Sequence, residues 1–167
     1  MLIGIPAETR AGEARVAATP ETVKKLVAGG HHKVLVQTGA GVSANIPDAE
    51  FEAAGATIAG AAADVFAQSD IVLVVRGPDA EVVGTMKRGA ILVGLLNPYD
   101  SGVIEGYAKT GITGLALESL PRTTRAQSMD VLSSQANIAG YKAVMIAANE
   151  YGRFMPMMMT AAGTVKA

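Results

Sequence analysis

The most regular feature of the chain is a series of short apolar runs separated by longer, more polar segments. The runs occupy residues 2–6, 34–37, 71–75, 90–96 and 112–117. Each run is continuous and does not alternate with polar residues, which is typical of strands covered on both faces, as in parallel sheets. The pattern therefore predicts a strand of a buried parallel sheet at each run.

The segments between these runs carry helix signals. In the first segment, Thr19 can cap a helix, Pro20 fits its first turn, and Gly29 with Gly30 can end it. Similar patterns predict helices within 48–56, 61–70 and 101–111. Alternating strands and helices indicate an α/β fold. We expect a Rossmann-like or flavodoxin-like parallel sheet with helices on both faces, and a long helix near the end of the chain.

That long helix is predicted from Met129 to about Tyr151. Ile138, Tyr141 and Met145 recur on one face, and the opposite face is also small and apolar. We expect such a helix to pack on two sides, against another domain or subunit. The following residues, 154–167, contain four Met and a Pro. They are interpreted as core or a buried linker, with a mobile surface between domains as the alternative.

Composition excludes several classes of function. The 167 residues suit about one domain, and the net charge of −1 with scattered Lys and Arg argues against nucleic-acid binding. The absence of Cys excludes disulfides, thiolate zinc sites and thiol nucleophiles. His31 and His32 are the only histidines, and we expect them in a solvated turn before a strand. No metal site is therefore predicted.

The chain is expected to be a soluble, cytoplasmic domain. No apolar run reaches the ~18–20 residues that a spanning helix needs, and the N-terminus does not resemble a signal peptide. A mean hydropathy of +0.31 is high for a free-standing surface. We therefore expect a piece of something larger, with apolar faces that meet neighbours.

Polar residues follow the apolar runs, where parallel sheets bind ligands. Five groups are candidates to converge on one rim: Glu8, Arg10 and Arg15; Thr38–Gly41; Arg76–Pro78; Asn97–Tyr99; and the segment 122–141 that follows the last run. The glycines of residues 39–44 do not form GxGxxG, and they predict a plain tight turn with no phosphate cradle. No nucleotide-binding fingerprint is present.

A denser polar segment joins the last run to the long helix. Its spacing brings Arg122, Gln127, Asp130 and Ser133 together at a helix start. Arg can grip a carboxylate or phosphate, Gln offers donor and acceptor, and Asp can accept from a hydroxyl or amide. A simpler interpretation is that Asp130 or Ser128 only caps the helix. These groups hold a ligand and do not attack it or act as acid or base, which fits hydride transfer by a cofactor.

Several stretches resemble one family, namely PAETRAGEARVAATPETV, QTGAG, RAQSMDVLSSQANIAGYKAV and MMMTAAGT. They are similar to the N-terminal domain of the NAD(H)-binding alpha subunit of proton-translocating NAD(P) transhydrogenases. The resemblance implies that residues 1–167 form the first of two Rossmann-like domains, and that the second, with the NAD fingerprint, is absent from this chain. It also implies that Arg122, Gln127 and Asp130, with Ser133, hold the NADH nicotinamide.

The same resemblance implies hydride transfer from NADH to NADP+, coupled to proton translocation across the membrane. The implied partners are the second domain, a second copy of the NAD(H)-binding component, and the NADP(H)-binding and membrane components. The implied location is the cytoplasmic side of the inner membrane, at its periphery. Alone, the chain is expected to bind NADH poorly and to be inactive.

Two alternatives remain open. The N-terminal stretch also resembles alanine dehydrogenase, in which the position of Arg15 holds the substrate carboxylate. That family uses Lys at the position of Arg76 and a catalytic His at the position of Asn97, so its oxidising residues are missing here. Arg15 is then expected to pair with Glu8 or Glu13. The other alternative is a non-enzymatic flavodoxin-like binding module.

Overall fold

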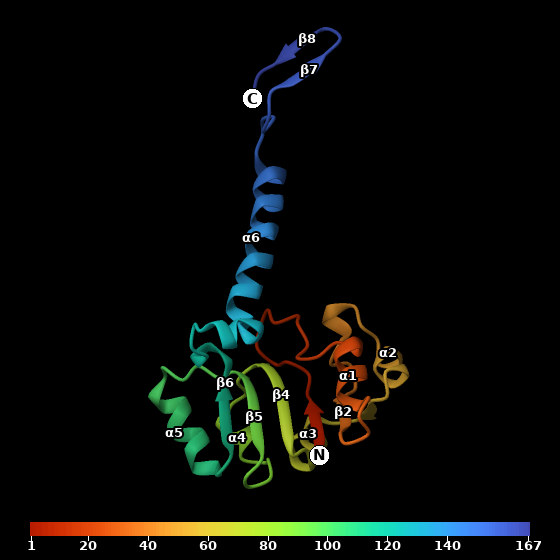
Figure 1. Cartoon of the computed structure of the whole chain (residues 1–167), viewed down its shortest axis with the longest axis vertical. Coiled ribbons are helices and arrows are strands. Elements are labelled where there is room, and N and C mark those ends of the chain that lie inside the picture. The colour runs from red at the N-terminus through yellow and green to blue at the C-terminus, as the bar shows by residue number, and fades with distance from the viewer. The chain divides into compact units, whose positions relative to one another are not determined.

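The computed structural model describes residues 1–167, which divide into two compact units. The first unit spans Met1–Pro121 and the second spans Arg122–Ala167. Figure 1 shows the chain coloured from its N-terminus to its C-terminus. None of the helices combines the length and the apolar character needed to span a bilayer.

The first unit is built on a six-stranded sheet in which every neighbouring pair of strands is parallel. Its spatial order is β3-β2-β1-β4-β5-β6. The strands are β1 Leu2–Ile5, β2 Lys33–Gln37, β3 Thr57–Ala59, β4 Ile71–Arg76, β5 Ile91–Leu95 and β6 Thr113–Ala116. The five predicted strands are confirmed. The short edge strand β3 is not predicted, because it has no apolar run.

Helices connect the strands and cover both faces of the sheet, as predicted. They are α1 Pro20–Val27, α2 Asp48–Ala53, α3 Ala62–Gln68, α4 Ala80–Val83 and α5 Ser101–Thr110, with short 3-10 turns η1 Val42–Ala44 and η2 Leu117–Ser119. Thr19 caps α1 by accepting a hydrogen bond from the Thr22 amide at 3.3 Å. The four-residue α4 is not predicted by the sequence pattern.

The core lies in two layers that follow the alternation of side chains along the strands. On β2, Val34 and Val36 pack with Val23 of α1 and Phe51 of α2. Between them Leu35 points to the other face, where it packs with Val65 of α3. A further cluster joins β4 and β5 to α3, α4 and α5. The sheet is therefore covered on both faces, which explains its continuous apolar runs.

The second unit contains the predicted long helix. A 3-10 turn, η3 Thr124–Met129, leads into α6 Val131–Glu150, and an antiparallel hairpin of β7 Met158–Thr160 and β8 Gly163–Val165 follows. Both faces of α6 are exposed, so its packing on two sides stays a prediction. The interpretation of 154–167 as core or buried linker is wrong for this chain, because all these residues are exposed and the two strands pair only with each other.

Candidate functional site

The carboxylate of Glu8 holds the end of β4. It accepts hydrogen bonds from the Val75 amide at 2.6 Å and from the Arg76 amide at 3.1 Å. Burial raises the pKa of Glu8, and the two amide donors oppose that rise. Glu8 comes from the loop after β1, so this contact ties two neighbouring strand ends together and fixes the backbone of Arg76.

Glu118 of η2 does the same for the end of β5. Its carboxylate accepts from the Leu96 amide at 3.2 Å and from the Asn97 amide at 2.6 Å. Asn97 has a φ of 53°, in the left-handed region that Asn tolerates better than most residues. Backbone strain held by surrounding contacts is typical of functional sites. The ends of β4 and β5 are thus each fixed by a carboxylate from a neighbouring loop.

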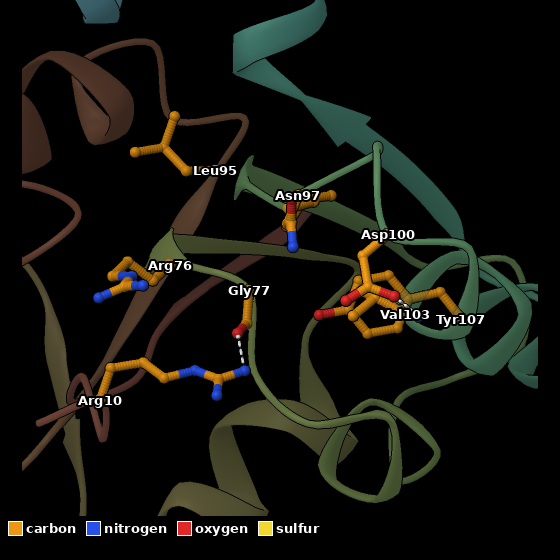
Figure 2. Close-up of a pocket in the computed structure, with 9 residues that line it drawn as sticks. Arg10, Arg76, Gly77, Leu95, Asn97, Asp100, Val103 and Tyr107 are labelled. Carbon is orange, nitrogen blue, oxygen red and sulfur yellow. Dashed lines mark hydrogen bonds between the residues drawn. The ribbon is translucent and has the colours of Figure 1, made fainter.

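Between these two strand ends lies a cavity of about 210 Å³. Its polar lining comes from the loops after β1, β4 and β5 and from α5: Arg10, Arg76, Gly77, Asn97, Asp100 and Tyr107. Figure 2 shows the two arginines on one side, Asp100 and Tyr107 on the other, and Asn97 between them. The predicted gathering of groups that follow β1, β4 and β5 is therefore confirmed.

Near Gly77, hydrogen bonds from the side chains of Arg10 and Tyr107 hold the wall of the cavity. The Arg10 guanidinium donates to the Gly77 carbonyl at 3.0 Å and pairs with Asp79 at 3.1 Å. The Tyr107 hydroxyl donates to the Pro78 carbonyl. A Cβ atom on Gly77 would lie 2.7 Å from that hydroxyl oxygen, so a larger residue could not occupy this position without a shift. Chain segments 67 residues apart are fixed to each other here.

Arg15 does not line the cavity. Its guanidinium Nε donates to the Glu13 carboxylate at 2.7 Å, which confirms one of the two predicted ion pairs. The hydrogen bond from Arg15 lowers the pKa of Glu13 to about 2. Glu13 is nearly covered, with its side chain 7% exposed, so this pair fixes the loop beside the rim.

The remaining strand-end group also lies outside the cavity. Thr38 and Gly39 donate to the Asp48 carboxylate at 2.7 and 2.9 Å, and Gly39 has a φ of 74°. The expectation that residues 38–41 share the rim cavity is wrong, because this turn is tied to the start of α2 instead. The prediction of a plain tight turn is confirmed. No group of His, Asp and Glu side chains that could hold a metal ion is present.

The second unit contains the four predicted ligand-holding residues in one continuous segment. Asp130 caps α6: its Oδ1 accepts from the Ser133 amide at 3.0 Å and its Oδ2 accepts from the Ser133 hydroxyl at 2.6 Å. These bonds lower the pKa of Asp130, and the charge of Arg122 contributes in the same direction. The capping interpretation is confirmed for Asp130 and does not apply to Ser128.

Arg122 and Gln127 are exposed, one just before η3 and the other within it. The Gln127 carbonyl accepts from the Asp130 amide at 3.3 Å, which closes the turn that leads into the helix. The segment thus presents a guanidinium and an amide in front of a capped helix. This set of donors and acceptors is compatible with an amide-bearing ligand such as a nicotinamide.

Three residues that shape the rim are absent from the sequence-based prediction: Asp100, which directly follows the predicted group 97–99, Glu118 and Tyr107. Glu118 follows the run 112–117 directly, and this position after a strand is a usable signal. No sequence signal points to Tyr107, because an aromatic residue on an amphipathic helix ordinarily belongs to the hydrophobic core. Tyr107 is indeed buried in the core cluster, and only its hydroxyl reaches the rim.

Comparison with known proteins gives consistent matches. Residues 4–139 match the family model described as alanine dehydrogenase/PNT, N-terminal domain. The chain is 51% identical over 171 aligned residues to an NAD(P) transhydrogenase alpha subunit of Rhodospirillum rubrum, covering 99% of the chain and 44% of that protein. It is 37% identical over 149 residues to alanine dehydrogenase of Mycobacterium tuberculosis, covering 89% of the chain and 39% of that protein.

A solved structure is also similar. The crystal structure of transhydrogenase from Sinorhizobium meliloti matches with a TM-score of 0.92 and 48% identity, over 100% of this chain and 50% of that one. The chain therefore spans about half, or less, of the length of the relatives it matches.

Proposed function

Because the chain belongs to the family of alanine dehydrogenase/PNT N-terminal domains, we propose that it is the first of two domains of the NAD(H)-binding alpha subunit of an NAD(P) transhydrogenase. The observation that carries this proposal is 51% identity along 99% of the chain to a transhydrogenase alpha subunit. Identity to an alanine dehydrogenase is lower, at 37%, and covers less of the chain. The complete protein would transfer hydride from NADH to NADP+ and couple that transfer to proton translocation.

The chemistry of the rim supports the same choice. Arg76 and Asn97 line the cavity, and the structure places no Lys or His there. A guanidinium keeps its proton, and an amide cannot serve as general acid or base. Oxidation of an amino acid requires such proton transfer. The lining of this cavity is therefore unsuited to alanine dehydrogenase chemistry.

In this proposal the second unit supplies the nicotinamide contacts. NADH, when bound, supplies the hydride, and the residues of this chain bind and orient its ring. The Arg122 guanidinium and the Gln127 amide donate hydrogen bonds, Gln127 and Asp130 accept them, and Ser133 supports Asp130 through the 2.6 Å hydroxyl bond. The low pKa of Asp130 keeps it ionised and able to accept.

The proposed partners follow from the family. The chain would work with the second domain of its own subunit, which carries the dinucleotide fingerprint, and with a second copy of the NAD(H)-binding component. Hydride would pass to NADP+ on the NADP(H)-binding component, and the proton would move through the membrane component. The assembly would sit on the cytoplasmic side of the inner membrane, with this chain at its periphery. Both apolar faces of α6 are available for such contacts.

The test uses the full-length alpha subunit, reconstituted with its NADP(H)-binding and membrane components. Asp130→Asn should slow hydride transfer to NADP+ in stopped-flow absorbance, while the Kd for NADH stays within about tenfold of the parent. The parent alpha subunit should show no reduction of NAD+ that depends on L-alanine. Alanine oxidation by the parent subunit would contradict the proposal, and so would unchanged hydride transfer in the variant.

A further inference from the structure

The first unit has another pocket at the opposite edge of the sheet, where the parallel strands begin and the N-terminus lies (Figure 1). Its lining comes from the starts of β1, β4 and β5, namely Met1, Asp70 and residues 87–91. We infer that this pocket binds a phosphate group, held by the side chains of Lys87 and Arg88. The inference stands apart from the transhydrogenase proposal and does not depend on it.

The charges of this pocket favour an anion. Lys87 and Arg88 bring two positive charges, and Asp70 is the one acidic residue of the lining. The Met1 amino group adds a third cation, but the excess of positive charge does not depend on it. Both oxygens of the Asp70 carboxylate already accept hydrogen bonds, Oδ2 from the Leu2 amide at 2.8 Å and Oδ1 from Lys87 Nζ at 2.9 Å.

Arg88 is the cation that remains available. No carboxylate lies within ion-pair distance of its guanidinium. Its side chain lies over Gly111, where a Cβ atom would be 3.2 Å from Arg88 Cγ and 3.5 Å from Arg88 Nε. The Lys87 ammonium has three N–H donors, and Asp70 takes one of them. The planar fork of a guanidinium and a compact ammonium therefore line the same pocket.

Backbone hydrogen bonds hold the turn that carries both side chains. Gly89, next to Arg88, has a φ of 81°, and its amide donates to the Gly111 carbonyl at 2.9 Å. The Ile91 amide donates to the Asp70 carbonyl at 2.9 Å. The turn is thus fixed to the chain segments that lead into β4 and β6. Preorganisation of this kind reduces the cost of ordering the site when a ligand binds.

Size and donor set indicate a phosphate group. The pocket volume of about 270 Å³ is enough for such a group with a few attached atoms, and it lies below the ~300–1,000 Å³ typical of pockets for drug-sized ligands. A phosphate monoester carries about −1.5 to −2 charges at pH 7 and has three acceptor oxygens. It can therefore accept from the guanidinium and the ammonium at once. The group can belong to a soluble phosphate or to the headgroup of an anionic lipid.

Arg88 has a simpler role that needs no ligand. A cation near the C-terminal end of a helix interacts favourably with the carbonyls there, and α5 ends at Thr110, next to Gly111. An arginine with that role alone would not bind phosphate in a saturable way. Removal of the Asp70 charge would also leave its environment without a ligand to report.

The test is an NMR titration of the untagged ¹⁵N-labelled chain with sodium phosphate, against sodium chloride at equal ionic strength. We expect saturable shifts of the Arg88, Gly89 and Ala90 amides with phosphate and none that saturate with chloride. Co-sedimentation with phosphatidylcholine vesicles, with and without phosphatidic acid, tests the lipid source. Binding only to vesicles with phosphatidic acid identifies a headgroup, and saturation by phosphate without vesicle binding identifies a soluble phosphate. Failure of both ligands to bind, or shifts that chloride reproduces, would overturn the inference.

Variants locate the binding. Arg88→Gln should raise the Kd about tenfold, because it removes a charged donor. Asp70→Asn should lower the Kd severalfold, because it removes the one carboxylate of the lining while its amide oxygen can still accept from the Leu2 amide. Arg153→Gln, at an exposed arginine of the second unit without an ion pair, is the matched control and should leave the Kd unchanged. Equal binding of either ligand by the parent, Arg88→Gln and Asp70→Asn proteins would also overturn the inference.

Discussion

At the residue scale, most side chains of the rim act by satisfying backbone groups. Glu8 and Glu118 each accept from two consecutive amides at a strand end, and Asp100 and Asp130 accept from amides at helix starts. A sequence shows that a carboxylate is present, but it does not show which backbone amides donate hydrogen bonds to that carboxylate. For this reason the sequence leaves Glu8 and Glu13 as equal partners for Arg15, whereas in the structure Glu8 binds the end of β4 and Arg15 pairs with Glu13.

The Glu13–Arg15 pair gives a pH-dependent contribution to stability. The pKa of Glu13 falls from its ordinary value of 4.5 to about 2 in the folded chain. The pair therefore stabilises the fold fully above pH 4.5, and this contribution is lost as the pH falls from 4.5 through 2. The full difference corresponds to roughly 3 kcal/mol, but Arg15 is 42% exposed. Solvent screening reduces the expected value to about 1–2 kcal/mol.

Glu13→Gln should accordingly lower the free energy of unfolding by about 1–2 kcal/mol at pH 7. The difference from the parent should shrink towards zero near pH 2. Urea unfolding followed by circular dichroism at several pH values measures it. Glu52→Gln, at an exposed residue without an ion pair, is the control. Glu8 has the opposite effect on the pH dependence of stability, because burial raises its pKa and its ionisation therefore lowers the free energy of unfolding. A Glu13→Gln effect that does not change with pH would contradict this assignment.

Asp130 combines a cap and a proposed ligand contact, and two substitutions separate them. Asn caps helices about as well as Asp, whereas Ala does not. Asp130→Asn should leave the melting temperature of the chain close to that of the parent, and Asp130→Ala should lower it. Differential scanning calorimetry makes the comparison. A large loss of stability in Asp130→Asn would mean that the charge is needed for folding, and would contradict the assignment of this side chain as an ordinary cap.

At the element scale, the apolar runs are sufficient to predict five strands, the helix signals between the runs predict α1, α2, α3 and α5, and apolar periodicity predicts α6. In the second unit the hairpin strands β7 and β8 are not predicted. In the first unit the strand and the helix that escape prediction are β3 and α4, of three and four residues. They are too short to show a period, and they form because the neighbouring strands and helices pack around them. The sequence also does not reveal that residues 38–41 lie outside the rim cavity. Their hydrogen bonds to Asp48 hold them at the start of α2, and these bonds depend on the tertiary fold.

The β4–β5 pairing depends on Gly94. A Cβ atom there would lie 2.4 Å from the Val74 carbonyl oxygen and 2.6 Å from its Cγ2. Gly94→Ala should therefore lower the free energy of unfolding by about 2–3 kcal/mol, because the obstacle is backbone and cannot move freely. Gly114→Ala on β6 is the matched control, since its Cβ would meet only the Leu96 side chain at 3.4 Å. Equal unfolding midpoints in urea for the two variants would contradict this prediction, because β4 and β5 could then move apart at little energetic cost.

At the scale of the whole molecule, apolar surface is concentrated in the second unit. Large apolar residues with more than half of their surface exposed include Ile138, Tyr141, Val144, Met145 and Ile146 of α6, and Met159 of the hairpin is 81% exposed. Exposed apolar patches of this kind mark surfaces that meet other proteins or domains. The high mean hydropathy of the chain predicts such surfaces, but it cannot locate them.

The chain should therefore self-associate in solution. Sedimentation velocity is expected to show a weight-average mass that rises with concentration. The double variant Met145→Glu with Ile146→Lys should reduce that rise, because it places charge on the exposed helix. Replacing Val42, an exposed residue of the first unit, with Lys is the control and should have no effect. A parent chain that stays monomeric across the concentration range would contradict the prediction.

The most direct test of the proposed division of labour is an NADH titration followed by nucleotide fluorescence. The 167-residue chain is compared with the full-length subunit under the same conditions. We predict saturable binding by the full-length subunit and little or none by the short chain, because in the proposed function this half orients the nicotinamide and the other half holds the dinucleotide. Equal affinity of the two proteins would place the nucleotide pocket within these 167 residues and contradict the proposal.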